Sequence, residues 1–208
     1  MSKVKLHVSV SLDGFTAGPD QSEENPLGIG GGQLHEWAFK LEAFGTEGGE
    51  VNASTPLAED ILSGVGAVIM GRNMFGGGTG DWGDGSWKGW WGDDPPYHCP
   101  VFVLTHHERE PLEMEGGTTF HFVTGGVGSA LEQAKVAAGD EYISIGGGAD
   151  AARQFLAAGL IDEITLDLIP VLLGDGARLF EGLGGLDLES TGVVEAPDAT
   201  HLSFRPVR

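Results

Sequence analysis

The sequence predicts an α/β protein with a mixed, mostly parallel sheet that is flanked by helices and completed by a C-terminal antiparallel hairpin. Short apolar runs alternate with helix-like segments through most of the 208 residues, which is the order that βα units produce. Several of these runs are apolar throughout, as in strands that are covered on both faces. The last two strand-like segments flank a Pro197-Asp198 turn, which indicates a hairpin.

The elements follow from local patterns in chain order. Alternation of apolar and polar residues over 4–10 predicts a strand that ends in a turn, and a polar loop follows to about residue 32. Apolar residues at helical spacing over 34–44 predict a first helix, and Ser54 or Thr55 with Pro56 predicts the start of a second. Further strands are expected at 67–70, 101–104, 119–124, 142–145, 164–173, 188–194 and 201–205, with helices at 128–138 and after Gly148.

Composition and charge limit the function classes. With 40% hydrophobic and 20% charged residues, the chain can fill a core, and its length fits one domain over 1–208. The formal net charge of −20 argues against nucleic acid and an anionic membrane surface as partners, because both require basic patches. A small-molecule substrate is therefore expected. A ligand that carries phosphate must find its cations among only 11 Lys and Arg residues.

Cysteine content and the first residues indicate a cytoplasmic protein. Cys99 is the only cysteine, so no disulfide can form within the chain. No apolar stretch of membrane-spanning length occurs, and the strand pattern begins within the first few residues.

A Gly- and Trp-rich insertion at about 76–98 is the unusual segment. Trp82, Trp87, Trp90 and Trp91 lie within 10 residues, which is too much apolar surface to leave in water. The segment should therefore pack on its own scaffold, pack on a second subunit, or cover a substrate as a lid.

The strongest local signal is a strand, three glycines and a helix start at 142–151. Gly146, Gly147 and Gly148 let a ligand approach the backbone closely, and the free amides of the helix that starts at Ala149 favour an anion such as a diphosphate. The alternative is an ordinary tight turn. The glycine spacing also fits a Rossmann fingerprint, but too few residues follow for the remaining βα repeats.

Three polar residues follow other predicted strands. Gly71-Arg72 comes after 67–70, Thr105 after 101–104, and Thr124 at the end of 119–124. Open α/β sheets bind ligands at the carboxyl ends of their strands, and the Arg fork suits phosphate. For each residue the alternative is a simple strand-end turn.

Six ordered segments together resemble the dihydrofolate reductase superfamily. The resemblance spans roughly residues 4–206 and is closest to the branch that contains the reductase domain of the bifunctional riboflavin-biosynthesis protein. The segments are 9–14 (SVSLDG), 68–72 (VIMGR), 100–105 (PVFVLT), 145–148 (IGGG), 160–164 (LIDEI) and 170–176 (PVLLGDG).

The resemblance implies a dihydrofolate-reductase-like fold, an NADPH cofactor and a homodimer. The three glycines and Ala149 would hold the diphosphate, Gly71 and Arg72 would lie near the 2′-phosphate, and Thr105 and His106 would lie near the adenosine half. Thr124 is a further expected cofactor-binding residue at the same edge. Asp13, Gly14 and Phe15 would lie near the nicotinamide and the substrate. Asp13 is the candidate catalytic residue, which orients the substrate or relays a proton through water.

The chain departs from the folate enzymes at the first helix. The helix segment offers only Glu36 and Glu42, with no evident match to the carboxylate that grips the pteridine. A riboflavin-type substrate, a pyrimidine with a phosphorylated sugar, is therefore expected instead of dihydrofolate. Its phosphate would need basic residues, which are few.

The expected function is hydride transfer from NADPH to a C=N or C=O carbon of a small heterocyclic or sugar-derived substrate. A protein that binds NADP(H) or another nucleotide without turnover is the alternative, because hydride transfer needs mainly positioning. A zinc site is disfavoured, since His98, Cys99, His106, His107 and His121 lack structural-zinc spacing. A hydrolase is disfavoured too, because Ser129 lies outside any nucleophile elbow.

Overall fold

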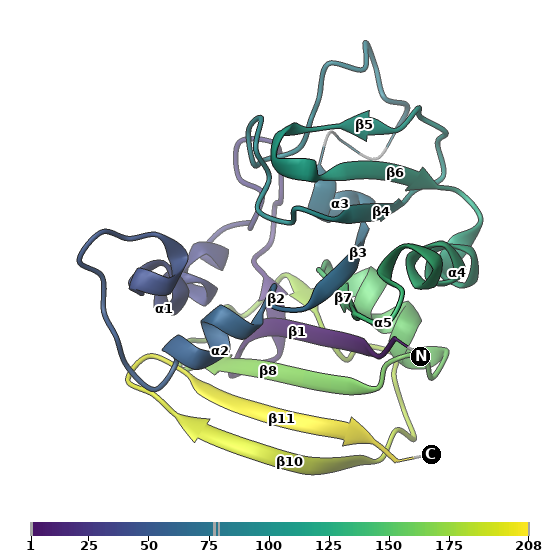
Figure 1. Ribbon diagram of the computed structural model, residues 1–208. Helices are drawn as coiled ribbons and strands as arrows, with labels where there is room; N and C mark the ends of the chain where they lie inside the picture. Colours follow the sequence, from purple (N-terminus) through teal and green to yellow (C-terminus); the bar gives the residue numbers. More distant parts are fainter. Residues whose placement is uncertain (1, 77, 79, 208) are drawn as a thin grey trace.

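A computed structural model describes residues 2–76, 78 and 80–207 of the chain. A nine-stranded mixed sheet crosses the molecule in the order β10-β11-β8-β1-β7-β3-β4-β6-β5 (Figure 1). Strands β8, β1, β7, β3, β4 and β6 are mutually parallel, whereas β5, β11 and β10 pair antiparallel. The expected sheet and hairpin are thus confirmed. The strands are β1 (Val4–Ser11), β2 (Phe15–Ala17), β3 (Val65–Gly71), β4 (Pro100–Leu104), β5 (Leu112–Glu113), β6 (Thr119–Val123), β7 (Tyr142–Ile145), β8 (Glu163–Ile169), β9 (Ala177–Arg178), β10 (Leu188–Glu195) and β11 (Thr200–Pro206).

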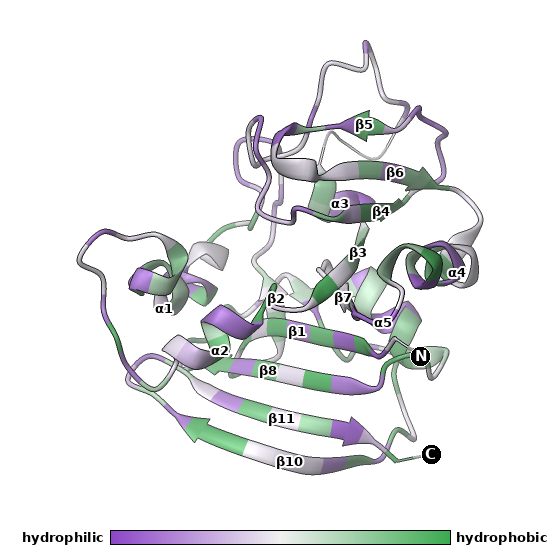
Figure 2. Cartoon of the chain, viewed as in Figure 1, coloured by the Kyte–Doolittle hydropathy of each residue, from purple (hydrophilic) through white to green (hydrophobic). Residues whose placement is uncertain are grey.

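Helices cover both faces of this sheet. Two longer helices, α4 and α5, pack on one face, and the short α1 and α2 lie on the other (Figure 1). The hydropathy bands along β1 and β8 alternate, while β4 and β6 are mostly apolar (Figure 2). The helices are α1 (Glu36–Phe39), α2 (Thr55–Asp60), α3 (Arg72–Phe75), α4 (Gly126–Ala138) and α5 (Ala149–Ala157), with 3-10 turns at Gly31–Leu34, Glu42–Phe44 and Glu115–Gly117.

The first predicted helix is wrong in its length. Instead of one helix over 34–44, the chain forms a four-residue α1 between two 3-10 turns. Leu41 adopts an extended backbone (φ −82°, ψ 143°) and pairs with Glu50, which ends the helix. The apolar spacing reflected a buried cluster of Leu34, Trp37 and Leu41, not a continuous helical stripe.

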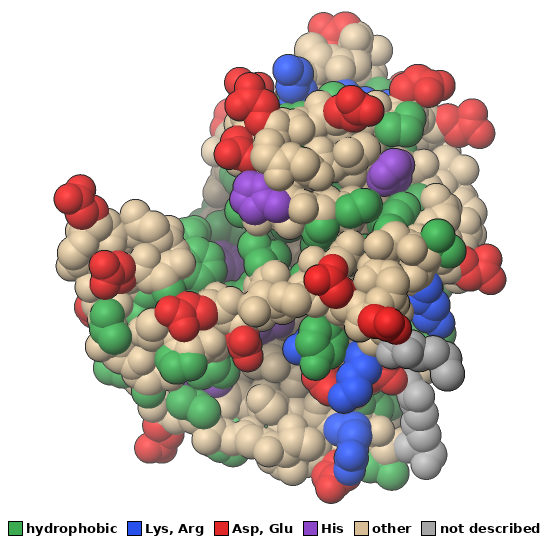
Figure 3. Space-filling model, viewed as in Figure 1, with side chains coloured by type: hydrophobic (Ala, Val, Ile, Leu, Met, Phe, Trp, Pro, Cys, Tyr) green, Lys and Arg blue, Asp and Glu red, His purple; other side chains and the backbone are tan. Residues whose placement is uncertain are grey.

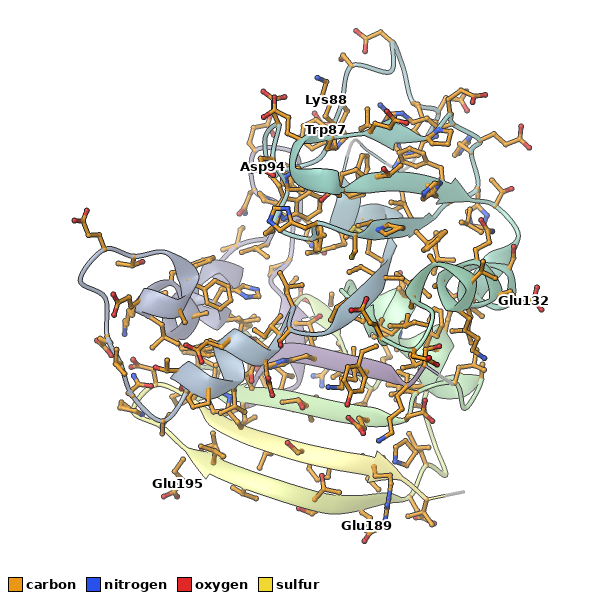
Figure 4. All side chains as sticks on the ribbon, viewed as in Figure 1. Trp87, Lys88, Asp94, Glu132, Glu189 and Glu195 are labelled. Carbon is orange, nitrogen blue, oxygen red and sulfur yellow. The ribbon has the colours of Figure 1, made fainter. Side chains whose placement is uncertain are left out.

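The insertion packs on its own scaffold. Trp82, Trp87 and Trp91 contact a cluster that includes Phe75 and Phe120. Figure 4 labels Trp87 and Lys88 in this segment, beside β5 and β6. Among the alternatives that the sequence left open, packing within the chain explains how the tryptophan side chains are covered. A second subunit is therefore not needed to bury them.

Cys99 lies directly after the insertion and is buried in the same cluster. Burial raises the pKa of its thiol to about 11. The thiol is therefore protonated at neutral pH.

Candidate functional site at the carboxyl edge

The carboxyl ends of the parallel strands bring most of the predicted site residues together. The Gly71 amide donates to the Gly147 carbonyl oxygen at 3.0 Å, and the Gly146 amide donates to Ile69 at 2.8 Å. The arginine turn after β3 and the glycine turn after β7 are therefore adjacent. The Thr105 amide donates to Val123 at 3.1 Å, which joins the ends of β4 and β6.

The glycine turn fits a phosphate. Gly147 has a φ of +109°, which side chains rarely adopt, and a Cβ placed on Gly148 would meet nothing within 4 Å. No side chain caps the start of α5, so no described side chain competes for its first amides. Gly148 and the α5 N-terminus thus form an open cradle with the partial positive charge that an anion needs.

Arg72 lies at the predicted place, but its side chain binds the insertion. Its Nε donates to the Gly78 carbonyl oxygen at 2.8 Å, and its guanidinium carbon lies 3.0 Å from the centre of the Trp82 ring. Burial, with a smaller effect of the nearby Arg109 charge, lowers the pKa of Arg72 to about 10. Arg72 remains a cation at neutral pH, and this cation holds the insertion against the sheet edge.

Arg109 is a second cation at this edge that sequence reasoning missed. Its guanidinium carbon lies 4.9 Å from the Trp82 ring centre and 5.0 Å from that of Phe122, and Nη2 donates to the Gly85 and Trp87 carbonyl oxygens. Its buried Nη1 has no hydrogen-bond partner among the described residues. The residue follows no strand directly, so only the scarcity of cations could have drawn attention to it.

Arg109, Phe122 and Thr124 line a cavity of about 490 Å³, together with Glu108 and Glu110. This volume lies in the range of small-ligand sites. Thr124 is exposed here, and His106 is exposed on the loop after β4. Thr105 differs, because its hydroxyl is buried and accepts from the His107 amide at 3.2 Å.

Asp13 holds the loop after β8. Its carboxylate accepts from the Ser11 hydroxyl at 2.6 Å and from the amides of Leu173 and Gly174 at 3.1 and 2.7 Å. The Ser11 hydrogen bond, with the two amides, outweighs burial and lowers the pKa of Asp13 to about 2. Asp13 is therefore ionised at neutral pH, so it can orient a group or accept a proton but carries none to donate.

The other predicted substrate residues flank Asp13. Gly14 has a φ of +89°, and the Phe15 ring is buried under the Arg178 guanidinium at 4.3 Å. Arg178 also donates to the Asp13 carbonyl oxygen at 3.1 Å, and Arg153 from α5 donates to the Arg178 carbonyl oxygen. Two arginines that the sequence did not assign thus lie between the Asp13 turn and the helix of the glycine turn.

Two absences hold for the part of the chain that the structure describes. No group of three or more His, Cys, Asp and Glu side chains is arranged to hold a metal ion. Within the same residues, no helix has both the length and the apolar character to cross a bilayer.

Sheet order, antiparallel C-terminal strands and a glycine turn beside an arginine turn define a dihydrofolate-reductase-like protein. The chain belongs to the RibD C-terminal domain family, whose model matches residues 2–202. The expected resemblance to the riboflavin branch is confirmed. Glu36 in α1 and Glu42 in the following 3-10 turn are both exposed.

Solved structures agree on the fold. A Shewanella sp. PV-4 protein described as a riboflavin biosynthesis protein has 24% identity and a TM-score of 0.67, with 99% of each chain covered. The Thermotoga maritima diaminohydroxyphosphoribosylaminopyrimidine deaminase/5-amino-6-(5-phosphoribosylamino)uracil reductase has 13% identity and a TM-score of 0.58; 99% of this chain covers 57% of that one. Enterococcus faecalis dihydrofolate reductase in complex with NADP(H) has 13% identity and a TM-score of 0.54, with 98% and 96% covered. No curated protein sequence matches the chain.

Proposed function

We propose that the chain is an NADPH-dependent reductase that transfers hydride to a C=N or C=O carbon of a small heterocyclic or sugar-derived substrate. The observation that carries the proposal is the hydrogen bond between Gly71 and Gly147. It holds the turn that carries Arg72 next to the open glycine turn at one edge of the sheet. Membership in the RibD C-terminal domain family supports the same reading.

NADPH, when bound, supplies the hydride. In the proposal, the α5 N-terminus with Gly146–Gly148 holds the diphosphate, and Arg72 and Arg109 provide the positive charge for the 2′-phosphate. Phe122 and Thr124 offer an aromatic face and a hydroxyl to the adenosine half, with Thr105 and His106 on the loop beside them. Except for Arg109, which lies on the loop between β4 and β5, these groups lie at the ends of β3, β4, β6 or β7.

Substrate recognition is assigned to the Asp13 turn. The ionised Asp13 fixes the loop around Gly174 and can accept hydrogen bonds from the N–H groups of a pyrimidine. Arg178 would meet the phosphate of a phosphorylated sugar, while Arg153 pairs with Asp150 and Glu181 and supports Arg178 through its carbonyl oxygen. The proposed class is a phosphoribosylaminopyrimidine such as the compound in the name of the Thermotoga reductase.

The decisive test is single-turnover oxidation of NADPH by the purified chain with 5-amino-6-(5-phosphoribosylamino)uracil, followed at 340 nm. Substrate-dependent loss of absorbance is expected. Tight NADPH binding without oxidation, across pyrimidines, pterins and quinones, would contradict a reductase.

A binding protein without turnover is the second candidate, and one observation favours it. The only predicted catalytic side chain has a pKa of about 2, so it brings no proton to a reduced C=N group. The same single-turnover experiment separates the two candidates. Homodimerisation is likewise a proposal, which light scattering at micromolar concentration tests directly.

A further inference from the structure

A buried row of polar side chains crosses three strands on the face that carries α1 and α2. Ser9 on β1 and His201 on β11 are both in register with Asp167 on β8. Side chains at matching register point to the same face, so the three are neighbours. The Ser9 hydroxyl donates to Asp167 Oδ2 at 3.1 Å, and His201 Nδ1 lies 2.7 Å from Asp167 Oδ1.

The two short helices extend this row at its ends. Trp37 Nε1 in α1 donates to the Ser9 hydroxyl at 3.1 Å, and its ring lies 5.0 Å from that of His201. The Ser54 hydroxyl, at the N-cap of α2, lies 2.8 Å from His201 Nε2. We call Trp37, Ser9, Asp167, His201 and Ser54 the polar row.

The chemistry of the groups fixes the direction of the hydrogen bonds among Trp37, Ser9 and Asp167. An indole N–H can only donate, so Ser9 accepts from Trp37 and gives its own proton to Asp167. The carboxylate also accepts from the Nδ1–H of His201, and in the neutral imidazole Nε2 is then the acceptor for the Ser54 hydroxyl. Although burial opposes ionisation, the hydrogen bonds from His201 and His7 hold the pKa of Asp167 below its usual range.

Ser54, His201 and Asp167 have the bonding order of a hydrolase triad but not its accessibility. Their exposed fractions are 3%, 1% and 2%, so no substrate reaches the hydroxyl. His7, the third side-chain partner of the carboxylate at 2.9 and 3.0 Å, is partly buried beside the same group. The role of the polar row is therefore structural: its side chains bind one another and not a substrate.

The helices that the polar row joins bury few side chains of their own. Helices α1 and α2 span four and six residues; α1 buries Trp37 and Ala38, and α2 buries only Ala58. Such short helices are not stable without external ties. Trp37 also packs in one cluster with Leu173, whose amide binds Asp13. Figure 3 shows that the surface is hollowed between the segment that carries α1 and the part that carries β4 and β6.

We propose that Asp167 and His201 are positioning residues that fix α1 and α2 as the substrate-side wall of the cleft. The cofactor side, built from the ends of β3, β4, β6 and β7, is anchored independently of the polar row. Loss of the polar row should thus weaken the substrate and leave NADPH binding unchanged. The inference rests on the proposed function only for the identity of the substrate.

Two substitutions of His201 each remove one of the two hydrogen bonds that its ring makes in the polar row. In His201→Asn the side-chain amide keeps a donor for Asp167 and removes the acceptor for Ser54; His201→Gln does the reverse. Ser54→Ala is the milder variant should either fail to fold. Ser203→Ala is the matched control, because it removes a hydroxyl from the same face of β11 that makes no side-chain hydrogen bond to any described residue, the polar row included.

Two measurements decide the proposal: hydrogen–deuterium exchange by mass spectrometry, and KM for 5-amino-6-(5-phosphoribosylamino)uracil beside Kd for NADPH. His201→Asn and Ser54→Ala should speed exchange in 55–60 by about 10-fold and raise KM by about 5-fold, the effect of one lost hydrogen bond, with NADPH Kd unchanged. Ser203→Ala should match the wild type.

Unchanged KM, or equal changes in KM and NADPH Kd, would overturn the positioning role. Faster exchange throughout the sheet would also overturn it, because it indicates general destabilisation. If the wild-type chain does not turn over this substrate, the proposed function fails separately, and the exchange data alone decide whether the row holds α2.

Discussion

Gly148 offers a test that separates a phosphate cradle from an ordinary tight turn. A methyl group added there in Gly148→Ala meets no atom of the protein within 4 Å. The same methyl group would point into the space that the proposed diphosphate occupies. Gly147→Ala is the matched comparison, since its φ of +109° makes any side chain strained.

The structure sets the expected magnitudes. Gly148→Ala should lower the free energy of unfolding by about 1 kcal/mol, the usual cost of alanine at an N-cap. Gly147→Ala should cost about 1–3 kcal/mol through backbone strain. For NADPH, loss of the close approach at Gly148 should raise Kd at least about 10-fold, or about 1.4 kcal/mol.

Urea unfolding gives the stability change, and isothermal titration calorimetry gives Kd for NADPH. The informative result is a Gly148→Ala protein with near-wild-type stability and weak NADPH binding. Wild-type affinity in that variant would refute the cradle and leave the turn as a purely structural feature.

Three further predictions follow from the same edge and from the buried carboxylate. Arg72→Ala and Arg109→Ala should each weaken NADPH about 10-fold more than NADH in calorimetric titrations, by loss of a charge-assisted bond, and equal losses for both cofactors would remove the 2′-phosphate role. Asp13→Asn should lower turnover while NADPH Kd stays constant, which stopped-flow absorbance measures; unchanged turnover contradicts the role of Asp13. Because the folded pKa of Asp167 is lowered, its contribution to stability is present above the unfolded value of about 3.9 and is lost as pH falls below it. The stability gap between wild type and Asp167→Asn, from urea unfolding at pH 3–7, should therefore narrow below about pH 4, and a constant gap would contradict this.

The sheet was predictable because its strands carry strong local patterns. Residues 67–70 are apolar and bounded by glycines, residues 142–145 run into the glycine turn, and alternation over 4–10 marks a strand with one polar face. The first helix was not predictable, since Leu34, Trp37 and Leu41 share a buried cluster without sharing a helix. Tertiary packing overrode the local period there.

For the candidate site, residues directly after strands were predictable and those on loops were not. Arg72 and the glycine turn follow strands, and parallel strands bring their carboxyl ends to one edge. Arg109 and Arg178 also lie at that edge, but Arg109 is placed there by its contact with Trp82 of the insertion, and Arg178 by the pairing of β9 with β2. The polar row draws its residues from five elements far apart in the chain (β1, α1, α2, β8 and β11), so no local pattern could reveal it.

The buried thiol of Cys99 can report local opening of the structure around it. Alkylating reagents need a thiolate within reach, and Cys99 in the closed structure offers neither charge nor access. The rate of labelling at mildly alkaline pH therefore measures how often the aromatic residues packed around Cys99 move apart and expose the thiol. Because Cys99 is the only cysteine in the sequence, no second thiol competes for the reagent and the measurement needs no introduced cysteine.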